Sequence, residues 1–314
     1  MAESRIAQLA TSPLLTQFAI TASQRAMRPI VNFLSPLCEV PDLTFRYKTY
    51  DDKNRYRVPV TRRALGSHAT IIGFTASDVQ GQLNPNALDF PIPNAEQLSD
   101  EALQYSIMEG QSTLADIGAL SLESEVVNTA LTSLSGAATA SQFSSNTIDP
   151  VAILDGIILN VMKAAKNGAP VKVLWGMSAF KLFRNNTNVR GRFVVGSGRN
   201  GGNVGLVSPG VDDSGSLLIT NPETQLSQFV IDSSPQGTTS SLEFLLDNAV
   251  IVFASNSTPN RMDPSFMKTF ARMGGFFKSS SYVTEDQRDE VLKMDWTTLV
   301  SVTNSAAAQM VTTS

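Results

Sequence analysis

The chain has 314 residues, a hydrophobic fraction of 42% and a formal net charge of −4, which supplies enough apolar material for buried cores and excludes a wholly disordered chain. The small net charge also excludes generic nucleic-acid binding over the whole surface. Because Cys38 and His68 are the single Cys and the single His, an internal disulfide and a metal site built on several His are excluded as well.

Residues 1–43 are predicted to form an N-terminal arm. Apolar side chains recur in this segment without one clean period, and a weak helix over 12–28 is expected to end at Pro29. Such an arm has no partner of its own and is expected to pack on another surface.

A strand-rich excursion follows the arm. Leu43, Phe45 and Tyr47 alternate with polar residues, which predicts a strand over 43–50. The DDKN sequence at 51–54 has the chemistry of a turn, and the alternation then returns. Because a lone hairpin is marginal in water, this excursion is expected to need a partner surface.

Charge is segregated along the chain. Residues 44–63 carry a net charge of +5, from seven basic residues against Asp51 and Asp52, whereas residues 64–162 contain eleven acidic residues and no Lys or Arg. A basic segment joined to an acidic body is complementary to other copies of itself, so copies are predicted to pair and polymerise. The basic residues assigned to this contact are Arg46, Lys48, Lys53, Arg55, Arg57, Arg62 and Arg63.

Residues 97–134 carry the strongest helical pattern. Ser99 is the candidate N-cap, and Gly110 and Gly118 are candidate kink positions. The apolar stripe is predicted to begin with Leu103, Ile107, Leu114, Ile117 and Leu120. The opposite face is acidic, and two interpretations stay open: a solvated helix face, or a docking surface for the basic segment. The acidic residues assigned to this surface are Glu96, Asp100, Glu101, Glu109, Asp116, Glu123 and Glu125.

The rest of the chain predicts an α+β body. Asp149 and Pro150 open a helix that ends at Gly168, and a buried strand at 171–176 leads into a helix at 177–186. A Gly- and Ser-rich loop is predicted over 196–216, and PNRMDPSFMKTF is predicted to be a loop as well. Further strands are expected at 216–220, 226–232 and 242–254. The chain is expected to end in a meander that turns at 285–289 and returns through Trp296.

No catalytic, cofactor or metal site is predicted. GSGRNG at 196–201 matches G-x-G-x-x-G, but the sequence after it is not expected to form the helix that a dinucleotide fingerprint requires. The acid cluster at 285–290 fits neither an EF-hand nor a two-metal spacing and is expected to be a solvated hairpin tip. Cys38 is expected to be a small buried apolar residue, and a Ser-His-Asp mechanism would have to use His68.

Membranes and nucleic acids are weaker partners than another copy of the chain. No stretch approaches the roughly 20 apolar residues of a membrane span, and the N-terminus does not look like a signal peptide, so a reducing, cytoplasmic setting is expected. The basic run at 53–63, interleaved with tyrosines, could bind phosphates. Nucleic-acid binding by this run is the weaker alternative, because the chain supplies its own acidic partner surface.

The order of these segments resembles the major capsid proteins of tailed bacteriophages, which have the Hong Kong 97-type fold. The resemblance covers nearly the whole chain and rests on the order and character of the segments rather than on one diagnostic motif. SPLLTQFAI and LSPLCEVPDLTFRYKTYDDKNRYRVPVTRRALGSHA look like the arm and the entry to the family's extended loop, and the acidic helix at 97–134 looks like its spine helix. VKVLWGMSAFKLFRNNTNVRGRF looks like a central strand and helix, and DNAVIVFASNSTPNRMDPSFMKTFAR with YVTEDQRDEVLKMDW looks like the late strand, loop and closing hairpin.

The resemblance implies an α+β, Hong Kong 97-like fold in four parts. These are an N-terminal arm (1–43), an extended β-hairpin loop (44–93), a peripheral domain with the spine helix (94–145 and 258–302) and an axial domain (146–257 and 303–314). It also implies a non-enzymatic virion protein without cofactors. Such a subunit self-assembles in the host cytoplasm into hexamers and pentamers that form an icosahedral head around double-stranded DNA.

The resemblance also implies partners. In the family the loop reaches over a neighbouring subunit, so the basic loop and the acidic helix become the expected contacts between subunits. A portal and decoration proteins are further expected partners. Because only residues 1–43 precede the loop, a scaffolding protein is expected to be a separate chain, or none is used. The subunit is expected to enclose double-stranded DNA without sequence-specific binding. Some members cross-link a loop Lys to a neighbour's Asn; Lys48 and Lys53 lie in the corresponding segment, but no Asn or Glu partner is identified.

Three rival interpretations stay open. An encapsulin-like compartment shares the fold but encloses enzymes. Another virion component, a tail or decoration protein, would form rings, tubes or trimers. An enzyme would need His68 or the loop at 196–201 to take part in chemistry.

Overall fold

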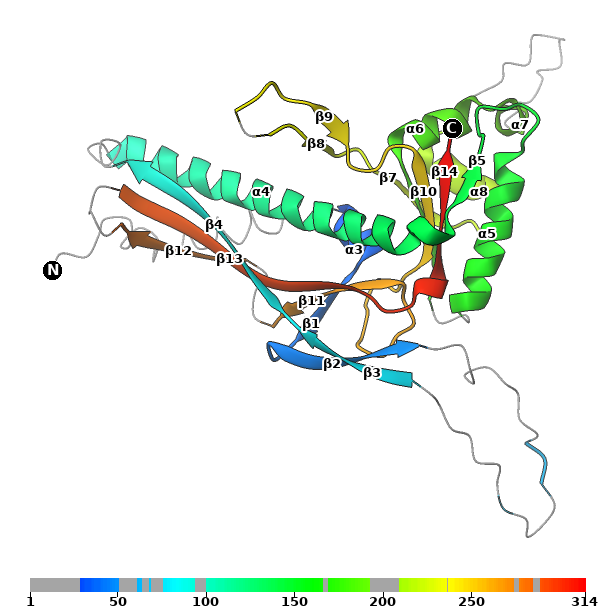
Figure 1. Ribbon diagram of the computed structural model, residues 1–314, viewed down its shortest axis with the longest axis horizontal. Helices are drawn as coiled ribbons and strands as arrows, with labels where there is room; N and C mark the ends of the chain where they lie inside the picture. The colour runs from blue at the N-terminus through cyan, green and yellow to red at the C-terminus, as the bar shows by residue number, and fades with distance from the viewer. Residues whose placement is uncertain are drawn as a thin grey trace, which may run out of the picture. The chain divides into compact units, whose positions relative to one another are not determined.

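The computed structural model folds into two compact units (Figure 1). The first takes in Gly81–Asn128 and Thr269–Ser301 with the chain up to Phe45, and the second takes in Arg46–Gln80, Thr129–Lys268 and Val302–Ser314. The predicted arm helix and the predicted turn at 51–54 lie outside the described residues. The structure describes residues 29–50, 61–63, 68, 76–93, 100–165, 169–192, 209–235, 237–273, 277–284 and 289–314.

The first unit is built on a five-stranded sheet. Four of its strands lie in the order β1 (Leu37–Val40), β11 (Met267–Arg272), β13 (Asp289–Val302) and β12 (Phe277–Val283). The fifth strand, β4 (Asn84–Pro93), also pairs with β13. β13 pairs antiparallel with both β12 and β4, so Leu292 lies opposite Ser281 and Phe90. β12 and β13 confirm the closing hairpin predicted from the sequence. The short helix α3 (Pro29–Leu34) precedes β1, which runs parallel to β11.

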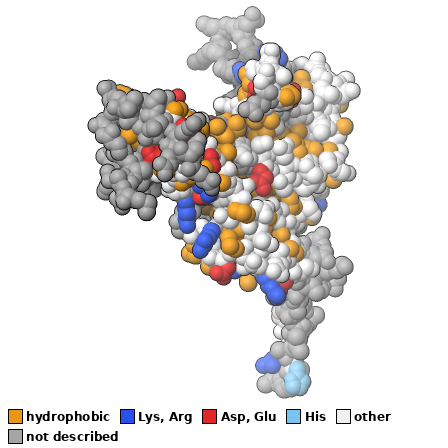
Figure 2. All heavy atoms as spheres, turned by 60° about the vertical axis from the view of Figure 1, so that its left-hand side comes forward, with side chains coloured by type: hydrophobic (Ala, Val, Ile, Leu, Met, Phe, Trp, Pro, Cys, Tyr) orange, Lys and Arg blue, Asp and Glu red, His pale blue; other side chains and the backbone are white. Residues whose placement is uncertain are grey.

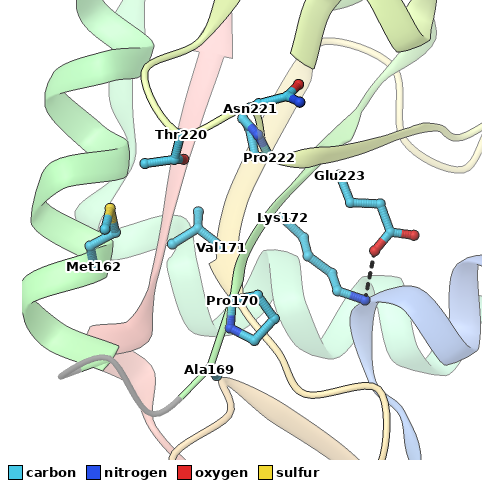
Figure 3. Close-up of a pocket in the computed structure, with 9 residues that line it drawn as sticks. All are labelled: Met162, Ala169, Pro170, Val171, Lys172, Thr220, Asn221, Pro222 and Glu223. Atoms are coloured by element: carbon cyan, nitrogen blue, oxygen red, sulfur yellow. Dashed lines mark ion pairs between the residues drawn. The ribbon is translucent and has the colours of Figure 1, made fainter. Parts of the chain in front are cut away.

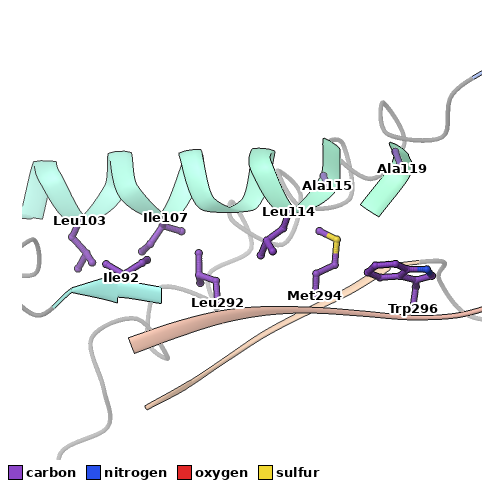
Figure 4. Packing of buried hydrophobic residues seen from close by; sticks show 9 residues of the cluster. All are labelled: Ile92, Leu103, Ile107, Leu114, Ala115, Ala119, Leu292, Met294 and Trp296. Atoms are coloured by element: carbon purple, nitrogen blue, oxygen red, sulfur yellow. The ribbon is translucent and has the colours of Figure 1, made fainter. Parts of the chain in front are cut away.

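One 35-residue helix, α4 (Asp100–Leu134), confirms the helix predicted over 97–134. Its apolar stripe packs on β4 and β13 in a single cluster (Figure 4). The predicted stripe fails at Ile117, which is 49% exposed, because Ala115 and Ala119 occupy the buried face instead. The cluster consists of Ile92, Leu103, Ile107, Leu114, Ala115, Ala119, Leu292, Met294 and Trp296.

Gly110 lets α4 lie close to the sheet. A Cβ atom at this position would be 2.7 Å from Cδ1 of Phe90 and 3.0 Å from Cδ1 of Leu292, closer than carbon atoms normally approach. The helix continues without interruption through Gly110 and Gly118. Gly110 therefore serves close packing at a point where the sequence alone indicated a kink.

The second unit is built on another five-stranded sheet, in the order β5-β14-β10-β6-β7. Its strands are β5 (Thr139–Ser141), β14 (Ala308–Thr313), β10 (Ala249–Ala254), β6 (Val171–Trp175) and β7 (Glu223–Leu226). The central strand β10 pairs antiparallel with β14 and β6, and all of its residues are buried. Such a continuous apolar run is typical of a strand that is covered on both faces.

Helices flank this sheet, and the predicted ones are confirmed. α5 (Pro150–Ala165) packs against β10, and Asp149 caps it by accepting a hydrogen bond from the Val151 N–H. α6 (Met177–Asn185) contacts β10 and β14. Its first turn receives Asp247, whose carboxylate accepts a hydrogen bond from the Ser178 N–H. A Cβ atom on Gly176 would lie 2.2 Å from the Asp247 carbonyl oxygen, so the turn before α6 requires glycine.

Two small sheets and several short helices complete the described fold. β2 (Thr44–Tyr50) pairs with β3 (Ala76–Gln82), which confirms the strand predicted over 43–50, and β8 (Val230–Asp232) pairs with β9 (Leu242–Phe244). The remaining short elements are α7 (Thr187–Arg190), α8 (Val211–Leu217), η2 (Ser135–Ala137) and η3 (Ser305–Ala307).

Four local predictions are corrected. The segment predicted as loop and strand around 211–220 contains helix α8, because the Asp213 carboxylate accepts a hydrogen bond from the Gly210 N–H and acids favour a first helical turn. Of the strand predicted over 226–232, only Leu226, at the end of β7, and Val230–Asp232, which form β8, lie in strands. The strand predicted over 242–254 is split where Asp247 turns to cap α6. The predicted loop PNRMDPSFMKTF gives way to β11 at Met267.

Replacement of Gly110 by Ala tests the close approach of α4. We expect Gly110→Ala to lower the free energy of unfolding by about 1–3 kcal/mol, the usual cost of overpacking a core. Gly156→Ala is the matched control, because Gly156 also lies within a helix but a Cβ atom there would meet nothing within 4 Å. The control should gain up to about 1 kcal/mol from helix propensity. Denaturant unfolding measures the change in the free energy of unfolding for both variants. Equal changes in the two variants would contradict the packing role of Gly110.

Candidate functional site

The basic residues assigned to contacts between subunits are only partly described. Arg46 and Lys48 lie on β2, where the strand alternation buries Phe45 and Tyr47 and leaves Arg46 exposed and Lys48 partly exposed. Arg62 and Arg63 are also exposed, and Lys53, Arg55 and Arg57 lie outside the described residues. The ring of Phe45 packs on Phe270 with 4.6 Å between centroids, which fixes the start of β2 on β11.

The acidic residues of α4 differ in their surroundings. Glu109 and Asp116 are exposed, whereas Glu123 is fully buried and so does not contribute to the surface. Glu125 is exposed at the surface, but partial desolvation raises its pKa above the usual value for a carboxyl group. Asp100 and Glu101 begin the helix, and Glu96 lies outside the described residues.

Two exposed apolar side chains accompany the acids on α4. Tyr105 is 67% exposed and Met108 is 44% exposed. Both share one helix face with Glu109, Ser112 and Asp116, because these positions recur at spacings of three and four residues. We call these five residues the acidic stripe. Glu109 and Asp116 were assigned from the sequence, whereas Tyr105 and Met108 were not, although the same periodicity places them opposite the buried stripe.

A buried lysine organises the loop between β10 and β11. Lys268 is fully buried, and its Nζ donates hydrogen bonds to the carbonyl oxygens of Asn260 and Asp263, both at 2.8 Å. Asp263 lies 3.7 Å from the same Nζ and accepts hydrogen bonds from the Asn260 and Ser265 N–H groups. A buried charge is tolerated when its hydrogen bonds are satisfied in this way.

The same loop holds the base of the basic segment. The Lys48 N–H donates a hydrogen bond of 3.3 Å to the Arg261 carbonyl oxygen. Thr303, beyond β13, donates from its hydroxyl to the Ser265 carbonyl oxygen at 2.6 Å. The sequence does not reveal this anchor, because the bonds of Lys48 and Thr303 join groups that are far apart along the chain.

A surface pocket of about 280 Å³ lies between the end of α5 and the start of β6 and β7 (Figure 3). Lys172 and Glu223 face each other across neighbouring strands, with 3.1 Å between Nζ and Oε2. Asn221, with φ of 45°, is in the left-handed region that Asn tolerates better than most residues. The titratable side chains among the lining residues are the two members of this ion pair. The lining residues are Met162, Ala169, Pro170, Val171, Lys172, Thr220, Asn221, Pro222 and Glu223.

The residues considered for chemistry do not converge in the part of the chain that the structure describes. Cys38 is buried, as predicted, and His68 is exposed. No three His, Cys, Asp or Glu side chains among the described residues gather closely enough to hold a metal ion. Glu290 is buried within β13, and the loop at 196–201 lies outside the described residues. None of the described helices combines the length and apolar character needed to cross a membrane.

Apolar side chains also reach the surface away from α4. On the face drawn in Figure 2, hydrophobic side chains appear between sparse charged ones. Only 17% of the residues are charged. Apolar side chains therefore make up part of the exposed surface on this face.

The fold has close counterparts although the sequence does not. No protein-family model and no curated protein sequence matches the chain. A phage-related protein from Bordetella bronchiseptica is 15% identical, with 96% of each chain covered and a TM-score of 0.67. A putative capsid protein of a prophage from Escherichia coli CFT073 is 8% identical, with 96% of this chain and 98% of that chain covered and a TM-score of 0.57. An encapsulin complex from Synechococcus elongatus is 13% identical, with 99% and 96% covered and a TM-score of 0.53.

These likenesses define the class of protein by its fold, which is a capsid-shell fold of mixed helices and sheets. More narrowly, the chain has the fold of phage major capsid proteins. The Hong Kong 97-type resemblance drawn from the sequence is thereby confirmed at the level of the fold.

Replacement of Lys268 tests the anchor beneath β2. Lys268→Met keeps the side-chain length but removes the donor to the Asn260 and Asp263 carbonyl oxygens and the cation beside the Asp263 carboxylate, so we expect the free energy of unfolding to fall by about 2–4 kcal/mol. Lys293→Met is the control, since it removes only a partly exposed ion pair with Asp295 and should leave stability nearly unchanged. Denaturant unfolding of the purified chain compares the two, and a loss no larger than the control's would contradict the anchor.

Proposed function

We propose that this protein is the major capsid protein of a tailed bacteriophage, a shell subunit that self-assembles into hexamers and pentamers of an icosahedral head around double-stranded DNA. The observation that carries the proposal is the match of the complete fold, over 96% of the chain, to a phage-related protein. A prophage capsid protein with nearly the same coverage supports it. No catalytic role is part of the proposal.

In this proposal α4 is the spine helix of the subunit. Residues 1–43 form the arm and 44–93 the extended loop. The peripheral domain comprises 94–145 with 258–302, and the axial domain comprises 146–257 with 303–314. The packing of α4 on β4 and β13 supports the role of a rigid spine, because one continuous apolar cluster fixes the helix along the sheet.

Assembly would combine charge with burial. The basic loop of one subunit meets the acidic stripe of a neighbour, where Glu109 and Asp116 are exposed beside Tyr105 and Met108. Exposed ion pairs contribute only about 0–1 kcal/mol each, so charge sets encounter and register. Apolar burial contributes about 25 cal/mol per Å², so Tyr105 and Met108 would supply more of the stability than the ion pairs.

The proposed setting is the virion, with assembly in the host cytoplasm. A separate scaffolding protein, a portal and decoration proteins are the partners that such a head would use. Packaged DNA would be enclosed without sequence-specific contacts, which agrees with the small net charge of −4.

An encapsulin-like shell is the second candidate. The specific observation that favours it is the encapsulin structure matched over 99% of the chain. The two candidates differ in what the shell encloses. Particles purified from the organism that encodes this chain would contain double-stranded DNA in the first case and enclosed enzymes without DNA in the second.

Electron microscopy of the purified recombinant chain tests the shell function. We expect closed shells or five- and six-fold rings in negative stain, with a matching high-mass peak in size-exclusion chromatography at low salt. Raising the salt concentration should shift this peak toward smaller species, because exposed charge pairs are screened. A chain that stays monomeric at every salt and protein concentration, also when it is co-expressed with the proteins encoded beside it, would contradict the proposal.

Charge reversal tests the pairing of loop and stripe. The variant with Arg55, Arg57, Arg62 and Arg63 all changed to Glu should remain folded but fail to assemble. Adding Glu109→Lys and Asp116→Lys to the same chain should restore assembly, because the reversed surfaces attract again. Far-ultraviolet circular dichroism controls for folding. Normal shells from the first variant, or no rescue in the second, would refute charge pairing while leaving the shell function intact.

A further inference from the structure

The β8–β9 hairpin carries apolar side chains that remain exposed in the described chain. Val230 pairs with Phe244 and Asp232 with Leu242, and directly opposed residues of an antiparallel pair share one face. On this face Val230 is 39% exposed, Phe244 41% and Leu242 69%. We call Val230, Leu242 and Phe244 the hairpin face. Among the described strands β8 and β9 pair only with each other.

The hairpin is nevertheless held in a defined shape. Asp232 accepts hydrogen bonds from the N–H groups of Ser234 and Ser241 at 2.9 and 3.0 Å, and from the Ser234 hydroxyl. These bonds lower the pKa of the Asp232 carboxyl, the Ser234 hydroxyl most of all. The Ser233 hydroxyl donates to Glu243 across the strands at 3.1 Å. A two-stranded sheet is marginal in water by itself, so a shaped hairpin with an exposed apolar face fits an element that is preorganised to bind.

The charge around the hairpin restricts its partner. Residues 200–260 contain no Lys or Arg, and the hairpin itself carries Asp232 and Glu243. Nucleic acid and anionic membrane surfaces would be repelled by such a segment. A fitting partner combines apolar surface with cations.

The same chain offers such surface elsewhere. Met273 is 58% exposed beside the exposed Arg272 at the end of β11. Many copies meet at high local concentration in a shell. A second copy therefore supplies both the apolar area and the positive charge that the hairpin lacks.

We propose that the hairpin face of each subunit docks onto a second copy of this chain and forms a contact between subunits separate from the pairing of loop and stripe. The inference rests on the proposed function, because a shell places copies side by side. Within it, the exposed apolar side chains of the hairpin face become buried on assembly, and Asp232, which lies on the same face, sets its orientation against a basic border.

Substitution of the hairpin face tests this contact. Leu242→Ser with Phe244→Ser should leave circular dichroism and the unfolding midpoint of the subunit unchanged and raise the protein concentration needed for assembly at least tenfold. The control is Leu159→Ser with Ile219→Ser, which removes two apolar side chains that are 41% and 56% exposed outside the hairpin. The control should assemble like the unaltered chain. If both variants raise the protein concentration needed for assembly equally, assembly depends on surface hydrophobicity in general. That result would overturn the assignment of the contact to the hairpin face.

Photo-crosslinking identifies the partner. The photoreactive analogue p-benzoylphenylalanine replaces Phe244 in an isotopically heavy chain, which is assembled with a light unaltered chain. We expect crosslinked peptides that join heavy position 244 to light residues, which only contact between copies can give. Crosslinks confined to the heavy chain itself, or crosslinks to a different protein, overturn the proposal. If the heavy and light chains assemble together but give no crosslink, the hairpin contact is refuted and the shell function is not. If the unaltered chain does not assemble at all, the shell function is refuted as well.

Discussion

The described fold of the first unit depends on one interaction, the burial of the apolar stripe of α4 against β4 and β13. Most of the stability of a helix in a protein comes from packing of its apolar face, and the 35-residue α4 packs that face on β13 and β4. Gly110 sets the distance between the two, since Phe90 and Leu292 occupy the space that a side chain would need. The long helix and the long strand stabilise each other, and this gives the unit a rigid axis on which an acidic stripe can be displayed.

Rigid parts and exposed adhesive parts are separated in this chain. The buried cluster, the fully buried β10 and the Lys268 anchor are satisfied within one subunit. The basic loop, the acidic stripe and the hairpin face are surfaces that a second copy would complete. A shell subunit needs this division, because it must fold before assembly and still retain enough exposed apolar area to associate. Charge alone would be too weak and too sensitive to salt for that purpose.

The candidate contacts were only partly predictable from the sequence. Charge segregation is a property of composition along the chain, so Arg46, Glu109 and Asp116 could be assigned without coordinates. Whether an acid reaches the surface depends on the helix face that the tertiary packing selects, which is why Glu123 turned out to be buried. The hairpin face was not predicted, because residues 242–254 were predicted to form one strand rather than β9 and β10. Asp247 divides this segment because it caps α6, where it accepts a hydrogen bond from Ser178, 69 positions earlier in the chain.

By itself the sequence determined the elements that local physics controls: the helix of α4, the capped start of α5, the buried strands β6 and β10 and the closing hairpin. Apolar periodicity and capping residues act within a few positions along the chain, so they can be read directly. Only the tertiary structure decided that Ile117 lies on the exposed face of α4 and that Gly110 must leave room for Phe90 and Leu292. It also decided how Lys268 holds its loop and which apolar side chains remain exposed. Those outcomes depend on contacts between segments far apart in the chain, and no local pattern encodes such contacts.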